Sequence, residues 1–187
     1  MRKIVAEMVG TALLLATVVG SGIMGERLSG GNVAIALLAN TLATGAMLVA
    51  LILTFGPISG AHFNPAVTLA DAYQGGIRWR ETPGYVVAQV VGAFAGVATA
   101  HVMFGEPVFS VSRHVRAGGA QMFSEFVATF GLLAVILGCG RARAASDTFA
   151  GIRPVDAPGF IAAQLAGAAA ATILFRWLHS VERENSL

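Results

Sequence analysis

Long apolar runs separated by short polar turns dominate this chain of 187 residues. A helix needs about 20 mostly apolar residues to cross a bilayer. Five runs have this length, and they predict spanning helices at about Ile4–Met24, Val33–Phe55, Pro83–Phe104, Gln121–Gly140 and Pro158–Leu178. Apolar and polar residues nowhere alternate with period two, so no strand is expected. The pattern therefore predicts an all-α membrane protein.

A shorter apolar segment lies between the second and third runs. Asn64 to Gln74 is 11 residues long, which makes about 16 Å of helix, or about half the hydrocarbon thickness. Asn64 suits an N-cap, Pro65 suits the first helical position, and Gly75-Gly76 suits the C-terminal cap. The polar stretch Gly56–Phe63 before it predicts a break in the second helix. We expect a re-entrant half-helix; spacing alone also allows an ordinary helix–turn–helix.

Such a segment has a definite physical character. Irregular backbone at membrane depth persists only where it is buried in protein or lines a wet cavity. Gly56–Phe63 would present carbonyl acceptors there, and the half-helix N-terminus would add partial positive charge. The Asn64 side chain would add an amide donor. This combination suits a neutral hydroxylic molecule such as water and opposes protons and cations.

Parts of the sequence occur twice. Residues 6–22 align with 124–140, and residues 76–93 align with 151–168. The offset between the copies falls from 118 to 75. The second copy therefore lacks 43 residues, which correspond to one crossing and one loop of the first.

The repeat favours one domain over residues 1–187, with repeat one at 1–104 and a truncated repeat two at 121–180. Composition agrees with a membrane location: 56% of the residues are hydrophobic and 12% are charged, against about 25% charged in soluble domains. Cys139 is the only cysteine, so no disulfide forms within the chain. A net charge of +2 gives no argument for a nucleic-acid partner.

Several motifs resemble those of the aquaporin and glycerol-facilitator family. The stretch from Ser59 to Thr68, SGAHFNPAVT, closely resembles the family signature. Other polar positions resemble the family's first and third helices and their repeat partners: Glu7 with Gly10-Thr11, Gln89 with Gly92, Glu125 and Gln164. The resemblance covers nearly the whole chain. It implies an aquaporin-like helical bundle of five spanning helices and one re-entrant half-helix.

By this resemblance Asn64, Pro65 and Ala66 form the first of two pore motifs, and the second Asn-Pro-Ala does not occur in this sequence. The resemblance also places Thr44 at the constriction of the pore. The residues expected to line the pore are Thr44, Gly60, Ala61, His62 and Phe63.

The ionisable and amide side chains within the apolar runs admit two interpretations, a structural role and a proton relay. In the family the equivalent glutamates accept hydrogen bonds from loop backbone, so the resemblance favours a structural role. The residues concerned are Glu7, Gln89, Glu125 and Gln164.

The expected function is a passive channel of the aquaporin or aquaglyceroporin type for water or small uncharged solutes such as glycerol. The alternative is a truncated, non-conducting membrane remnant or an assembly partner of such a channel. No nucleophile–base pair or ligand cluster predicts an enzyme, a metal or a cofactor. We expect a multi-pass protein of the cell membrane, the bacterial inner membrane in particular, with lipid and small neutral solutes as partners. The resemblance implies a homo-tetramer.

Overall fold

The computed structural model describes residues 1–108 and 117–138, together with 159, 162–163, 166–167, 169–170 and 173. No strand occurs among these residues. The predicted last helix, Pro158–Leu178, falls largely outside the described residues, and its described positions are helical. Gln164 also lies outside them.

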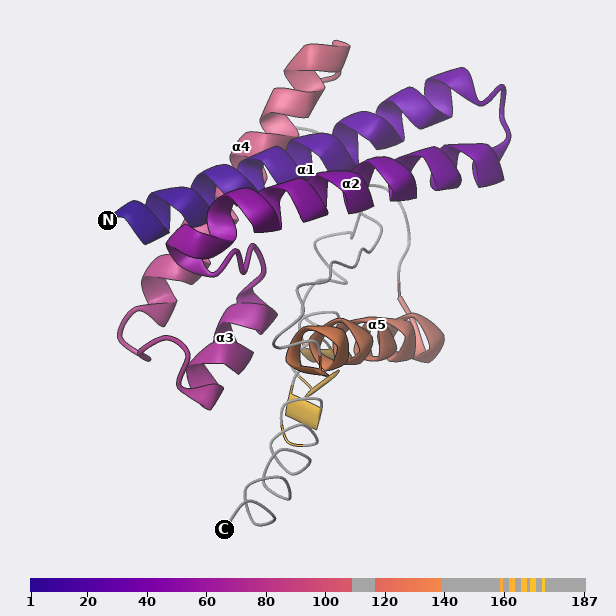
Figure 1. Ribbon diagram of the computed structural model, residues 1–187. Coiled ribbons are helices and arrows are strands. Elements are labelled where there is room, and N and C mark those ends of the chain that lie inside the picture. The colour runs from indigo at the N-terminus through magenta and orange to yellow at the C-terminus, as the bar shows by residue number, and fades with distance from the viewer. Residues whose placement is uncertain are drawn as a thin grey trace.

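Five helices form within the described residues: α1 (Arg2–Leu28), α2 (Val33–Ser59), α3 (Pro65–Gln74), α4 (Thr82–Phe104) and α5 (Gly119–Gly138) (Figure 1). All except α3 are long and apolar enough to cross a membrane. The 10 residues of α3 make about 15 Å of helix, which is too short to do so. The all-α prediction and the separate short helix are therefore confirmed, and the first four predicted spanning helices have the length and composition to cross a membrane.

The predicted end of the second helix was wrong, because α2 passes Phe55 and continues through Pro57 to Ser59. A proline in a helix removes one backbone hydrogen bond, but two contacts support this last turn. The Ser59 carbonyl accepts a hydrogen bond from the Tyr85 hydroxyl at 2.9 Å. Gly60 adopts the left-handed conformation, with φ 92°, and donates its N–H back into the turn.

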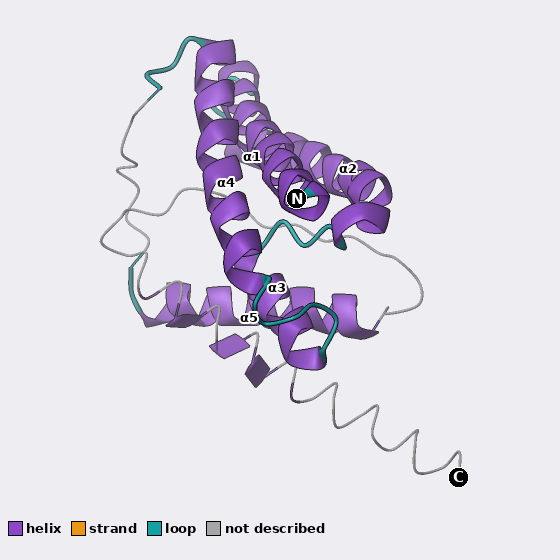
Figure 2. Ribbon diagram, turned by 90° about the vertical axis from the view of Figure 1, so that its left-hand side faces the viewer, coloured by secondary structure: helices purple, strands orange, loops and turns teal. Residues whose placement is uncertain are grey.

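Glycines on α4 bring this helix against the backbone of α1. A Cβ atom on Gly92 would lie 2.3 Å from the Met8 carbonyl oxygen, and one on Gly96 would lie 2.2 Å from that of Ala12. Small residues allow such close approach of helices in membranes. With α2 running along another side of α1 (Figures 1 and 2), α1 is the central helix of this group.

Within the described part of the chain, the fifth helix, α5, does not pack against the group formed by α1, α2 and α4. Among the described helices, α5 contacts only α3, and it lies across the direction of α1 and α2 (Figures 1 and 2). Its side chain Leu133 is fully buried against Ala66, Val67 and Ala70 of α3. One side of the half-helix therefore faces an apolar wall.

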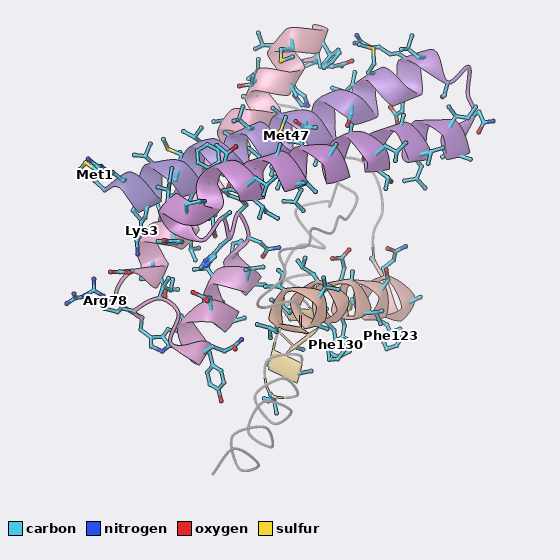
Figure 3. All side chains as sticks on the ribbon, viewed as in Figure 1. Met1, Lys3, Met47, Arg78, Phe123 and Phe130 are labelled. Atoms are coloured by element: carbon cyan, nitrogen blue, oxygen red, sulfur yellow. The ribbon has the colours of Figure 1, made fainter. Side chains whose placement is uncertain are left out.

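Basic residues gather at one end of the α1–α2 pair. Lys3 and Arg78 both lie there (Figure 3). Arg78 donates from Nε to Glu81 at 2.9 Å, and this hydrogen bond lowers the pKa of the Glu81 carboxyl. Arg27, in the last turn of α1, forms an ion pair with Glu106 at 2.8 Å.

Replacing Gly92 with alanine should separate α1 from α4, because the new methyl group would meet the rigid backbone of Met8. We expect a loss of stability of about 1–3 kcal/mol, as for other overpacked contacts, measured by thermal unfolding in detergent. Gly45→Ala in α2 is the matched control, since its Cβ would meet nothing within 4 Å. Equal unfolding temperatures for the two variants would contradict the close contact.

Candidate functional site

The chain reverses direction between α2 and α3 through an unusual backbone. Gly60, Ala61 and Phe63 all have positive φ, at 92°, 53° and 49°. The left-handed conformation costs about 1–2 kcal/mol for a residue with a side chain. Ala61 and Phe63 therefore need specific contacts to hold them in this conformation.

The carboxylate of Glu7 holds Phe63 directly. It holds Ala61 through the Ser59 hydroxyl, which accepts the Ala61 N–H at 3.1 Å. The carboxylate is fully buried on α1 and accepts four hydrogen bonds: from the Ser59 hydroxyl at 2.6 Å, the His62 N–H at 3.0 Å, the Phe63 N–H at 2.8 Å and the Gln89 amide at 2.8 Å. An ionised carboxylate has about four acceptor positions. Each oxygen takes two donors, so the loop and α4 are both tied to α1.

The Thr68 hydroxyl extends this network into the half-helix. Thr68 accepts from Gln89 Nε2 at 2.8 Å and donates to the Asn64 carbonyl at 3.1 Å. His62 Nδ1 lies 3.1 Å from the same hydroxyl. Ser59 and Thr68 lie at the two ends of the signature stretch, but no hydrogen-bonding role was predicted for them or for Tyr85. A hydroxyl group near a helix end gives no sequence pattern that distinguishes such a role.

The residues that flank α3 contact α1, and these contacts fix the direction of α3. The Phe63 ring, next to the start of α3, occupies the space above Gly10, where a Cβ atom would lie 2.1 Å from it. Beyond the other end of α3, Ile77 packs with Ala72 against Ile4. Gly10 lies about 9 Å further into α1 than Ile4. The half-helix therefore begins inside the bundle. It runs back toward the end of the bundle at which α1 begins and α2 ends, as a re-entrant helix does.

Asn64 caps this inner end as the sequence predicts. Its Oδ1 accepts the Ala66 N–H at 2.8 Å, and Pro65 is the first helical residue. Gly75 closes the other end in the left-handed conformation. Among the described residues, Asn64 Nδ2 makes no hydrogen bond. An amide donor is thus left open beside the positive end of the helix dipole.

A cavity of about 540 Å³ lies between α2, the loop, α3 and α5. Of the predicted pore-lining residues, Gly60, Ala61 and His62 line this cavity, whereas Thr44 and Phe63 do not. The polar and charged side chains that line the cavity are those of Lys3, Ser59, His62 and Asp71. Lys3 and Asp71 were not predicted from the sequence as lining residues, because a single charged side chain near a helix end usually faces water.

The remaining predicted site residues lie apart from the cavity. Thr44 is buried in α2, and its hydroxyl has no hydrogen-bond partner among the described residues. Glu125 is half-buried on α5. Within the described part of the chain, no three His, Cys, Asp or Glu side chains gather to hold a metal ion.

Glu7→Gln should destabilise the protein by about 3 kcal/mol. The new amide nitrogen must replace one carboxylate oxygen, and each oxygen faces two donors. At either position two buried donors lose their acceptor, at about 1–3 kcal/mol each. Unfolding in detergent measures the loss. Glu26→Gln, at an exposed position of the same helix, should change stability by less than about 0.5 kcal/mol, and an equally small effect at Glu7 would refute the network.

Comparison with known proteins places these features in one family. Residues 1–153 match the family model of the major intrinsic protein family. The chain is 47% identical to aquaglyceroporin AqpS of Rhizobium meliloti, over 95% of this chain and 90% of that relative. It is 36% identical to the probable aquaporin NIP7-1 of Arabidopsis thaliana and 32% identical to a probable glycerol uptake facilitator protein of Thermotoga maritima.

Coverage differs among these relatives. The matches to the Arabidopsis and Thermotoga proteins cover 75% and 72% of this chain but only 51% and 63% of those relatives. The alignment with AqpS spans 210 residues, more than the 187 of this chain, so part of that relative has no counterpart here. The extent of the family match and its agreement with the helical architecture identify the chain as a multi-pass membrane protein of the major intrinsic protein family, whose members are channels.

Proposed function

We propose that this chain forms a passive channel for water and small uncharged solutes such as glycerol. The observation that carries the proposal is the half-helix α3, which starts inside the bundle with an open amide donor at its capped N-terminus. The names of the relatives, an aquaglyceroporin and a glycerol uptake facilitator among them, support this class of solute.

The proposed path uses the residues around this helix end. Asn64, Pro65 and Ala66 present the amide donor and the positive dipole, which favour a neutral hydroxylic solute over a cation. Gly60, Ala61 and His62 line the path, and Thr44 and Phe63 contribute nearer the midplane.

Four polar side chains keep their structural role in this proposal. Glu7 and Gln89 hold the loop in place, which their hydrogen bonds support. Glu125 and Gln164 serve the same purpose in the second repeat. The whole chain acts as one domain in the bacterial inner membrane and assembles as a homo-tetramer, and no catalytic step is involved.

Stopped-flow shrinkage of proteoliposomes tests this function. Vesicles containing the protein should shrink faster than empty vesicles in an osmotic gradient and should take up glycerol faster. Circular dichroism on the same vesicles checks that the helices are intact. Permeability equal to that of empty vesicles, with full helical signal, would contradict conduction and favour a remnant.

Asn64→Asp removes the amide donor and places a negative charge at the capped helix end. Aspartate caps a helix about as well as asparagine, so α3 should persist, but the side chain loses its N–H₂ donor. We expect water permeability to fall about 3–10-fold, which corresponds to one hydrogen bond in the transition state of permeation. Unchanged permeability would mean that the amide lies outside the path.

A further inference from the structure

The wall of the cavity contains a carboxylate that the proposed path does not use. Asp71 lies on α3, and its Oδ2 is 3.5 Å from His62 Nε2. The Asp71 side chain is 36% exposed, whereas that of His62 is 7% exposed. Both residues line the cavity. Asp71 therefore has one side against the imidazole and keeps part of its surface accessible to a solute.

The position of this carboxylate depends on a glycine. A Cβ atom on Gly76 would lie 2.1 Å from Asp71 Oδ1, so any larger residue at 76 would displace the carboxylate. The Gly76 N–H also donates to the Asp71 carbonyl at 2.9 Å. The carboxylate is thus held between His62 on one side and the bare backbone of Gly76 on the other.

Much of the remaining lining has a different chemistry. It includes aliphatic side chains from α2 and α5: Ile52, Ile58, Leu133, Ile136 and Leu137. The volume of about 540 Å³ lies within the range of about 300–1,000 Å³ found for small-molecule sites. It far exceeds the roughly 30 Å³ that one water molecule occupies. The cavity can hold a small organic molecule with one polar face and one apolar face.

We propose that Asp71 and His62 form a binding position for polyols in this cavity, which makes Asp71 a specificity-determining residue of the channel. The two carboxylate oxygens accept hydrogen bonds from neighbouring hydroxyl groups, and hydrogen bonds to a charged acceptor are the strong ones. The C–H groups of the same polyol contact the aliphatic side chains, a contact that water cannot make. The inference rests on the proposed channel function and names the solute feature that this chain selects.

Two variants test the position in different ways. Asp71→Asn keeps the shape of the side chain and removes its charge. Gly76→Ala keeps the charge and displaces the carboxylate. Each should lower glycerol permeability about 3–10-fold, the effect of one strong hydrogen bond, and leave water permeability unchanged. Glu81→Gln removes a carboxylate outside the cavity and should change neither permeability.

The outcomes separate binding from support of the loop. A glycerol-to-water permeability ratio equal to that of the wild type in both variants would overturn the proposal. An equal fall of both permeabilities would also overturn it, since Asp71 would then only position His62 and the loop.

A second measurement does not require conduction. In a Cys139→Ser background, Ile136→Cys places a thiol on the cavity wall, and glycerol should slow its modification by a thiol reagent. The protection should disappear when Asp71→Asn is added. If the wild type does not conduct but shows this protection, the channel function fails and the polyol position stands. Absence of protection overturns the polyol position itself.

Discussion

One buried carboxylate holds the non-helical stretch on which the rest of the site depends. Glu7 accepts hydrogen bonds from two successive loop N–H groups and from side chains of α2 and α4. Hydrogen bonds to a charged acceptor contribute about 1.5–3 kcal/mol each. These hydrogen bonds oppose the cost of the left-handed Ala61 and Phe63, about 1–2 kcal/mol each. The turn that places the N-terminus of α3 inside the bundle is therefore held by α1.

The local features of the site could be predicted from the sequence. Asn64, Pro65 and Gly75 fix the ends of α3 by capping, which depends only on neighbouring backbone, and the structure has these caps where the sequence places them. The end of α2 could not be predicted, because Pro57 reads as a helix breaker. The turn that contains it is supported by Tyr85, which lies 26 residues away from Ser59 along the chain.

The wider network depends on contacts between distant parts of the chain. The donors to Glu7 come from residues 52 to 82 positions away along the chain. Asp71 meets His62 only when the loop folds back onto α3. Hydropathy indicates that an ionisable residue inside a spanning helix faces the protein interior, but it does not identify the groups that meet it there. Sequence therefore predicts the half-helix more completely than the cavity beside it.

The cavity lining combines polar and apolar side chains from several helices. Lys3, Ser59, His62 and Asp71 are polar or charged, whereas α5 supplies only Leu133, Ile136 and Leu137. Only one Asn-Pro-Ala occurs in the sequence, and its residues do not line this cavity. Selection among neutral solutes then depends on how the polar and apolar side chains of one cavity match the two faces of the solute.

Hydrogen exchange of the His62 and Phe63 amides, in protein reconstituted in lipid, tests the role of Glu7 most directly. Both residues lie outside any helix, where amides ordinarily exchange fast. If Glu7 holds the loop, these two amides exchange as slowly as those in the middle of α1 and α4. Exchange at the rate of an open loop would contradict the account.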